Sequence, residues 1–117
     1  MPVLIEPHVD HRRKANRPSG ARAKELTGIL TAARLFRFRG PVRVSERRKN
    51  GRWIHQCTLL GIYADGQTRE ESWQAFVEIF ECDWDSVASE KDSRLTEGAR
   101  ALKRKYLELV EGVEPVL

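Results

Sequence analysis

The pair Asn50-Gly51 constrains the fold of this chain more than any other feature of its sequence. It separates two runs of alternating apolar and polar residues, and Asn-Gly favours the positive φ angles of a two-residue turn that joins paired strands. We therefore expect residues 42–48 and 52–58 to form an antiparallel hairpin. Residues 59–63 supply another short strand or extend the second one, and Gly66 marks the turn that follows.

The run before this turn has a period of two, which predicts a strand with two different faces. The apolar residues of one parity are Phe36, Phe38, Val42 and Val44. The arginines of the other parity are Arg37, Arg39, Arg43 and Arg47. We expect an apolar inner face and a cationic outer face, with a bend or a break at Gly40-Pro41 because proline suits a bulge or an edge strand.

Three stretches have the spacing of amphipathic helices. Thr68 and Glu71 form a capping box that opens a main helix over residues 69–88, whose aromatic stripe begins at Trp73. Thr96 caps a last helix over residues 97–111, which Gly112 ends and which either completes the core or swaps between protomers. A further helix is expected over residues 21–33, because Leu26, Ile29, Leu30 and Ala33 fall on one helical face.

These elements predict an α+β fold in a chain of 117 residues, which is long enough for one core. We expect a small antiparallel sheet of about three strands over residues 36–63, packed on the main helix 69–88 and followed by the helix 97–111. Residues 1–20 read as a basic flexible tail, since they hold too little apolar surface to offset the entropy of ordering. Residues 21–117 then form a single domain.

The net charge of +4 conceals an asymmetry along the chain. Residues 1–52 hold 14 Lys and Arg against 4 Asp and Glu, whereas residues 53–117 hold 7 against 13. Cations of the first half would bind phosphates without reading sequence. The candidate nucleic-acid-binding residues are Arg12, Arg13, Lys14, Arg17, Arg37, Arg39, Arg43 and Arg47. The same charges also suit an acidic protein surface, including that of a second copy, or simply a solvated strand face.

Catalytic and metal-binding motifs are not found in the sequence. The two cysteines, Cys57 and Cys82, fit no metal or redox spacing, so we expect free thiols, no metal and no cofactor. A hydrolase that uses Cys57 with His55, or the carboxylates, is a minor alternative to a protein without enzymatic activity. No apolar run is long enough to span a membrane, and residues 1–10 lack a signal peptide's apolar stretch, so we expect a cytoplasmic protein.

The string from Glu46 to Ile54, followed by Leu60-Gly61-Ile62 and by Gly66-Gln67-Thr68-Arg69-Glu70-Glu71-Ser72, resembles the HicB-like antitoxin superfamily. The resemblance implies a small antiparallel sheet on one helix, in a protein that neutralises a small basic RNase toxin by direct binding. Here Gln67 and Ser72 replace the family's usual Asp and Ala, and we expect neither a strand after the main helix nor a separate DNA-binding tail.

If the resemblance holds, the protein is a binding module and is expected to be a homodimer. The alternative role is that of a regulator that binds nucleic acid. The residues expected to contact a basic toxin lie on the main helix. They are Glu71, Glu78, Glu81 and Asp85, with Trp84 as an apolar anchor or as part of the core.

Overall fold

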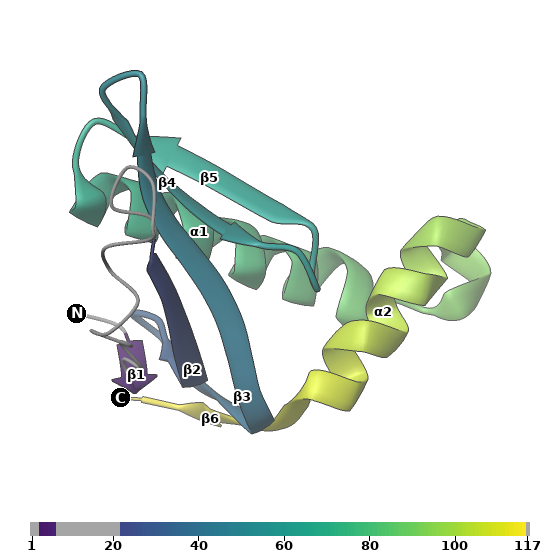
Figure 1. The fold of residues 1–117 in the computed structure, drawn as a ribbon. Helices are drawn as coiled ribbons and strands as arrows, with labels where there is room; N and C mark the ends of the chain where they lie inside the picture. The colour runs from purple at the N-terminus through teal and green to yellow at the C-terminus, as the bar shows by residue number, and fades with distance from the viewer. Residues whose placement is uncertain (1–2, 7–21, 117) are drawn as a thin grey trace.

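The hairpin around Asn50-Gly51 is the centre of an α+β fold in the computed structural model, which describes residues 3–6 and 22–116 (Figure 1). The strands are β1 (Val3–Glu6), β2 (Arg22–Leu30), β3 (Arg34–Lys49), β4 (Arg52–Cys57), β5 (Ile62–Gly66) and β6 (Val110–Pro115). The helices are α1 (Arg69–Asp83) and α2 (Glu97–Leu109), and a π-helical turn, Trp84–Ala88, follows α1. The sheet therefore has more strands than the three expected.

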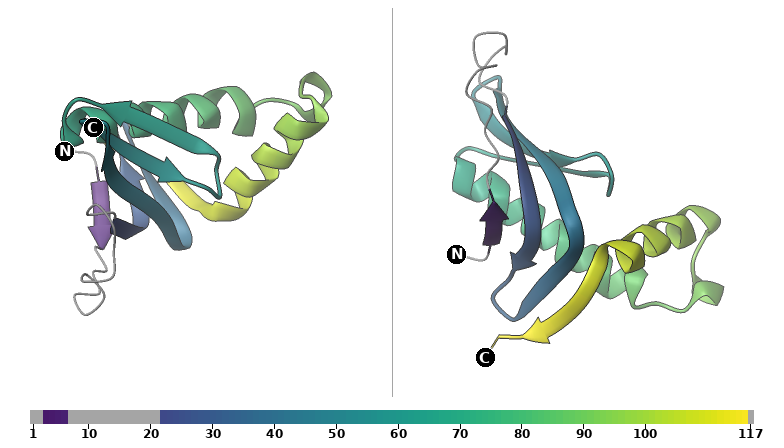
Figure 2. Two further views of the ribbon diagram at one scale, coloured as in Figure 1. Left: turned by 45° about the horizontal axis from the view of Figure 1, so that its top comes forward. Right: turned by 60° about the horizontal axis from the view of Figure 1, so that its bottom comes forward.

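All strand pairs are antiparallel, and the strands follow one another in the order β1-β2-β3-β4-β5. The sixteen-residue strand β3 is long enough to take two neighbours on one edge. Its C-terminal half pairs with β4, and its N-terminal half pairs with β6, which returns from the far end of the chain (Figure 2). The first four residues described lie within the expected tail, yet they pair with β2 as β1.

The predicted turn is confirmed by its backbone angles. Asn50 has φ 53° and Gly51 has φ 79°, the left-handed values that this dipeptide favours. The register runs from Lys49 opposite Arg52 to Ser45 opposite Gln56. One face of the hairpin therefore points toward α1 and the other points away from it.

The predicted helix over residues 21–33 is wrong, because Arg22–Leu30 form β2 and the next residues turn into β3. A β-bulge explains the misleading spacing: Leu26 pairs with Val42, whereas Gly28 pairs with Arg37. The shift turns Leu26 and Ile29 to the same face, although they are three residues apart, as in a helix. On β3 the same irregularity covers Gly40-Pro41, so the predicted bend occurs within one continuous strand.

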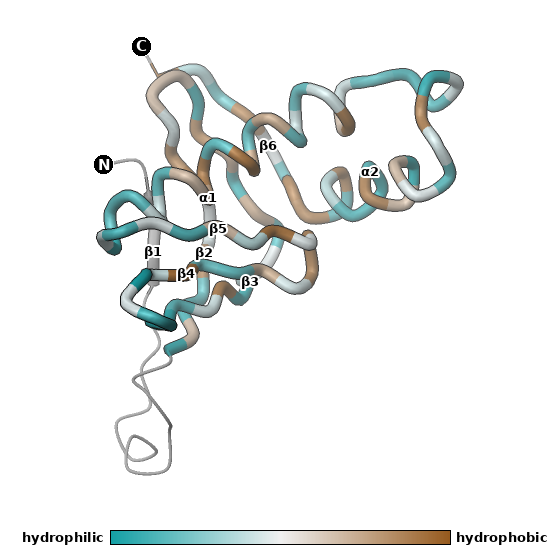
Figure 3. The backbone as a smooth tube through the Cα atoms, turned by 90° about the horizontal axis from the view of Figure 1, so that it is seen from above, coloured by the Kyte–Doolittle hydropathy of each residue, from teal (hydrophilic) through white to brown (hydrophobic). Residues whose placement is uncertain are grey.

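Helix α1 covers one face of the sheet, crossing behind β4 and β5 in the view of Figure 1. Its predicted start is confirmed, since the Thr68 side chain accepts a hydrogen bond from the Glu71 backbone N–H at 3.0 Å. The aromatic stripe is buried as expected and packs on the inner face of β3, with the Phe36 and Phe80 ring centroids 5.1 Å apart. In Figure 3, hydrophobic residues alternate with hydrophilic ones along the strands that form this face.

The last helix ends at Leu109, earlier than the expected residue 111, and the chain then continues as β6. The predicted cap is confirmed by a bond from the Ala99 N–H to Thr96 Oγ1. The expectation that no strand follows the main helix is wrong, because Val113 pairs with Phe36 along the edge of β3. Tyr106 anchors α2 to the core, since its ring is fully buried and packs on Phe80.

Candidate functional site

The outer face of the sheet, which points away from α1, carries the arginines that the alternation of β3 predicted. Arg37, Arg39 and Arg43 are exposed, and Arg47 is half-buried. They follow one another along β3 from the end that pairs with β6 to the end that pairs with β4. The structure therefore places all four on one face, but it gives them different surroundings.

At the β6 end the arginines are bound to the C-terminal part of the chain. Arg37 Nε donates to Glu114 Oε2 at 2.6 Å, and this hydrogen bond raises the pKa of Arg37 above its ordinary value. Arg39 Nε donates to the backbone carbonyl of Glu108 at 2.9 Å. These two contacts link β6 and the end of α2 to β3 at the surface, so part of the arginine charge is already paired within the fold.

In the middle of β3, Arg43 faces Glu25 across the sheet. Further along, Arg47 donates to Gln56 Oε1 at 2.9 Å, and its guanidinium lies 5.9 Å from the centroid of the exposed Tyr63 ring. Both contacts hold the Arg47 side chain flat against the outer face.

The β3–β4 hairpin ends in a dense group of cations, which we call the hairpin cluster: Arg47, Arg48, Lys49, Arg52 and Arg69. Arg48 and Arg69 lie over the Trp53 ring, with distances of 5.5 and 4.7 Å to its centroid. Arg52 Nε pairs with Asp65 at 2.8 Å.

Of this cluster, sequence reasoning named Arg47 as a candidate and missed Arg69, which opens α1 among acidic residues. The two-residue Asn50-Gly51 turn sets the register that places Arg48 opposite Trp53, so this contact could have been predicted from the sequence. The approach of Arg69 to the same ring depends on the packing of α1, for which the sequence holds no local signal.

A buried polar network lies beneath the hairpin cluster, on the face toward α1. His55 Nε2 donates to Glu46 Oε2 at 2.9 Å, and His55 Nδ1 is 2.7 Å from Ser72 Oγ. Lys24 Nζ is 3.1 Å from Glu46 Oε2, and Arg69 Nε is 3.5 Å from Glu46 Oε1. Glu46 continues the parity of Val44, so the alternation of β3 already places it on the inner face.

Glu46 is ionised in this network. Burial alone would raise its pKa, but hydrogen bonds from His55 and Lys24, with the charges of Lys24 and Arg69, outweigh burial and lower the pKa to about 2. The carboxylate therefore joins β2, β3, β4 and the first turn of α1 at the base of the hairpin.

Ser72, His55 and Glu46 have the residue types of a nucleophilic triad, but their surroundings do not suit one. The Ser72 side chain is fully buried, and its hydroxyl donates to the Ala64 carbonyl at 3.3 Å. A nucleophile must reach its substrate, so this network holds the fold together. His55 is engaged with Glu46 and Ser72, and burial raises the pKa of the Cys57 thiol, which disfavours the thiolate that a Cys–His pair needs.

The acidic residues expected to contact a partner are partly used within the chain. Arg34 Nη2 lies 2.9 Å from Glu81 Oε2, and Arg34 Nη1 lies 3.0 Å from Asp85 Oδ1. The Glu71 side chain accepts from the backbone N–H of Gln67, the residue before the cap Thr68, at 3.0 Å. Trp84 is half-buried against Phe36, so most of its anchoring is internal.

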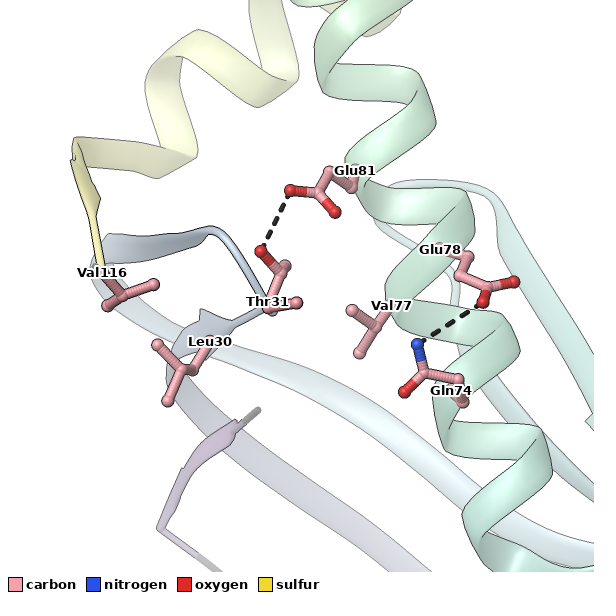
Figure 4. A pocket seen from close by; sticks show the side chains of 8 residues that line it. Leu30, Thr31, Gln74, Val77, Glu78, Glu81 and Val116 are labelled. Atoms are coloured by element: carbon pink, nitrogen blue, oxygen red, sulfur yellow. Dashed lines mark hydrogen bonds between the residues drawn. The ribbon is translucent and has the colours of Figure 1, made fainter. Parts of the chain in front are cut away.

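Glu78 is exposed and lines a shallow groove of about 610 Å³ between α1, the β2–β3 turn and the end of the chain (Figure 4). Figure 4 shows Glu81 accepting a hydrogen bond from Thr31 and Gln74 reaching toward Glu78. The groove is lined by Leu30, Thr31, Ala32, Gln74, Val77, Glu78, Glu81 and Val116. Its floor is apolar and its α1 side is polar.

Other expected features lie outside the described residues or have no counterpart within them. Arg12, Arg13, Lys14 and Arg17 fall in residues 7–21, outside the described part of the chain. Within residues 3–6 and 22–116, no group of three or more His, Cys, Asp or Glu side chains is arranged to hold a metal ion. Neither helix of this described portion is long and apolar enough to cross a membrane.

The chain was compared with known protein families, curated proteins and solved structures. No protein-family model, no curated protein and no solved structure matches this chain.

Proposed function

We propose that this protein is a binding module without enzymatic activity that contacts nucleic acid through the hairpin cluster and the adjoining outer face of β3. The observation that carries the proposal is the gathering of five cations from β3, β4 and α1 around Trp53 and the Asn50-Gly51 turn. Such a concentration of positive charge binds phosphates by releasing counterions, and it needs no base contact to do so.

The two ends of β3 support this choice of site. Arg37 and Arg39 are fastened to Glu114 and to the Glu108 carbonyl, whereas Arg48 and Lys49 are exposed at the hairpin tip. Arginine keeps several N–H donors free when one of them is engaged, so Arg47 and Arg52 still have donors for phosphate. The hairpin end is therefore where the fold presents most charge to a partner.

The test is binding to fluorescent duplex DNA, duplex RNA and single strands over a range of salt concentrations. The intact protein should lose affinity steeply with salt, and the triple variant R48A/K49A/R52A should flatten the slope of log K against log salt by about 2 to 3. The matched control is R94A/R104A/K105A, which removes three exposed cations from α2 and the turn before it. Circular dichroism checks that each variant folds.

A salt-independent signal, or equal losses in R48A/K49A/R52A and in the matched control, would sink the proposal. The first result would remove the electrostatic mechanism. The second would show that net charge, and not this cluster, governs binding.

A second candidate is a HicB-like role in which the protein neutralises a small basic RNase toxin, and β6 favours it. A strand after the main helix is usual in the family that the sequence resembles, and β6 occupies that place beside β3. The acidic surface left for a toxin centres on Glu78 and the groove of Figure 4, because Glu81 and Asp85 bind Arg34.

Co-expression with a neighbouring gene that encodes a basic, RNase-like protein tests this role. Co-purification and relief of toxicity are expected, and Glu78→Lys should weaken both, whereas Glu97→Lys at the exposed start of α2 should not. Toxicity that persists in the presence of the intact protein would exclude the antitoxin role.

A further inference from the structure

We propose that the β3–β4 hairpin enters the major groove of B-form duplex DNA. The inference rests on the proposed nucleic-acid binding and deepens it, because it names the form of nucleic acid that the hairpin cluster fits. It follows from three properties of the hairpin, which are its projection, the distribution of its cations and its rigidity.

The hairpin projects beyond the strands that flank it in the described part of the chain. On one side β2 begins at Arg22, opposite Glu46, and on the other side β5 ends at Gly66, opposite Trp53. Residues 49–52 therefore extend beyond both neighbours as a short two-stranded ribbon, seen at the top of Figure 1. At about 3.3 Å per residue the turn stands roughly 7 Å beyond the end of β5, which is most of the depth of about 8.5 Å of a B-DNA major groove.

The width of the major groove also fits a two-stranded ribbon but is too small for the whole sheet. The major groove is about 12 Å wide and admits a two-stranded β-ribbon. Five strands at a spacing of about 4.8 Å span roughly 19 Å, so the sheet face cannot follow the hairpin into the groove. Only the tip enters, and the outer face of β3 remains beside the phosphate backbone.

Cations lie on both faces of this ribbon. Lys49 and Arg52 are opposite each other on the outer face, and Arg48 is opposite Trp53 on the face toward α1. A ribbon lying in a groove has a phosphate backbone on each side, so charge on both faces matches both walls. Asn50 at the tip adds an amide, and Arg and Asn side chains are the ones that most often bind base edges bidentately.

The hairpin is rigid before it binds. Its two-residue turn adopts the angles that Asn-Gly favours, and both Arg48 and Arg69 lie over the Trp53 ring. At its base the Glu46–His55 pair is buried and joined to Ser72 of α1. A preformed ribbon loses little conformational freedom on binding, which favours affinity.

The same contacts disfavour a single strand as the ligand. Proteins that bind single strands stack bases on accessible aromatic rings. The Trp53 ring, which is the aromatic ring of the hairpin, is half-buried and has two guanidinium groups over it, so it offers little area on which a base could stack. Duplex RNA fits less well than duplex DNA, because its major groove is deep and too narrow for side chains to read.

The experiment compares mixed-sequence duplex DNA with three probes of equal length: duplex RNA, single-stranded DNA, and duplex DNA whose cytosines carry glucosylated hydroxymethyl groups that fill the major groove. Unmodified duplex DNA should bind at least about tenfold more tightly than each, which corresponds to about 1.4 kcal/mol. Methyl green, which occupies the major groove, should displace the protein, whereas netropsin in the minor groove should not.

Each other result overturns the inference, and the results separate it from the proposed function. Equal binding of glucosylated and unmodified duplexes, or tighter binding of RNA, excludes the major groove while nucleic-acid binding stands. Binding to none of the probes excludes both. Salt-dependent duplex binding that survives in R48A/K49A/R52A shows that another surface is used.

Discussion

The two ends of β3 carry the same arginine pattern and use it differently. At the β6 end, Arg37 and Arg39 bind Glu114 and the Glu108 carbonyl, so their charge is paired within the chain. At the hairpin end, Arg48 and Lys49 face solvent, and Arg48 lies on Trp53. Alternation along a strand decides which face a side chain takes, but what the side chain contacts is decided by elements that are distant in sequence.

The difference extends to the carboxylates that accompany each end. Glu46 lies inside the protein with Lys24, His55 and Arg69, whereas Glu114 meets Arg37 at the surface. A buried, hydrogen-bonded charge is costly to disrupt, and an exposed pair is screened by water and salt. The hairpin end should therefore depend strongly on its carboxylate, and the β6 end only weakly.

Replacing Glu46 breaks this comparison most directly. Glu46→Ala should lower the free energy of unfolding by about 2 to 3 kcal/mol, because it leaves His55 without its acceptor and the cations without their counter-charge. The value lies toward the low end for a buried pair, since Lys24 and Arg69 can turn to solvent. Urea unfolding followed by circular dichroism measures the change, with Glu114→Ala as the matched control that should stay near the wild type.

Similar losses in the two variants would show that the network under the hairpin is no stronger than a surface pair. Glu46→Gln separates charge from shape, because the amide keeps the size of the side chain and can still accept a hydrogen bond from His55. It should destabilise less than Glu46→Ala.

The pH dependence of stability tests the contribution of Glu46 in a second way. The pKa of Glu46 is lowered from 4.5 to about 2 in the folded protein, so its ionised form stabilises folding fully above pH 4.5. That contribution is lost progressively as the pH falls from 4.5 toward 2. Unfolding measured across this window should show a smaller pH dependence in Glu46→Gln than in the wild type. An unchanged slope would assign the acid sensitivity to other carboxylates.

The parts of the fold that local chemistry determines could be predicted from the sequence. Asn50-Gly51 predicted the hairpin, and Thr68 and Thr96 predicted the helix starts, because a turn and a cap are settled within a few residues. The failures came from long-range pairing. The bulge between Leu26 and Gly28 gives β2 a helical spacing, and β6 forms because β3 leaves an edge open for residues 110–115.

The candidate site follows the same division. The outer-face arginines were predictable from alternation, and Glu46 was predictable as an inner-face residue by the same parity. Arg69 and the pairing of Glu81 and Asp85 with Arg34 were not, because they depend on how α1 packs on the sheet. A charge pattern in the sequence therefore gives candidates, and the fold decides which of them remain available to a partner.

The smallest expected effect concerns the surface pair between Arg37 of β3 and Glu114 of β6. A double-mutant cycle of Arg37→Ala and Glu114→Ala should give a coupling within the error of an unfolding measurement at high salt, since both side chains are about half exposed. Arg37→Ala should also leave nucleic-acid affinity near that of the wild type, because its guanidinium lies at the opposite end of β3 from the hairpin cluster. A large coupling energy would mean that the pair holds β6 in place. A loss of affinity in Arg37→Ala comparable to that of R48A/K49A/R52A would extend the binding surface along the whole of β3 and remove the distinction between its two ends.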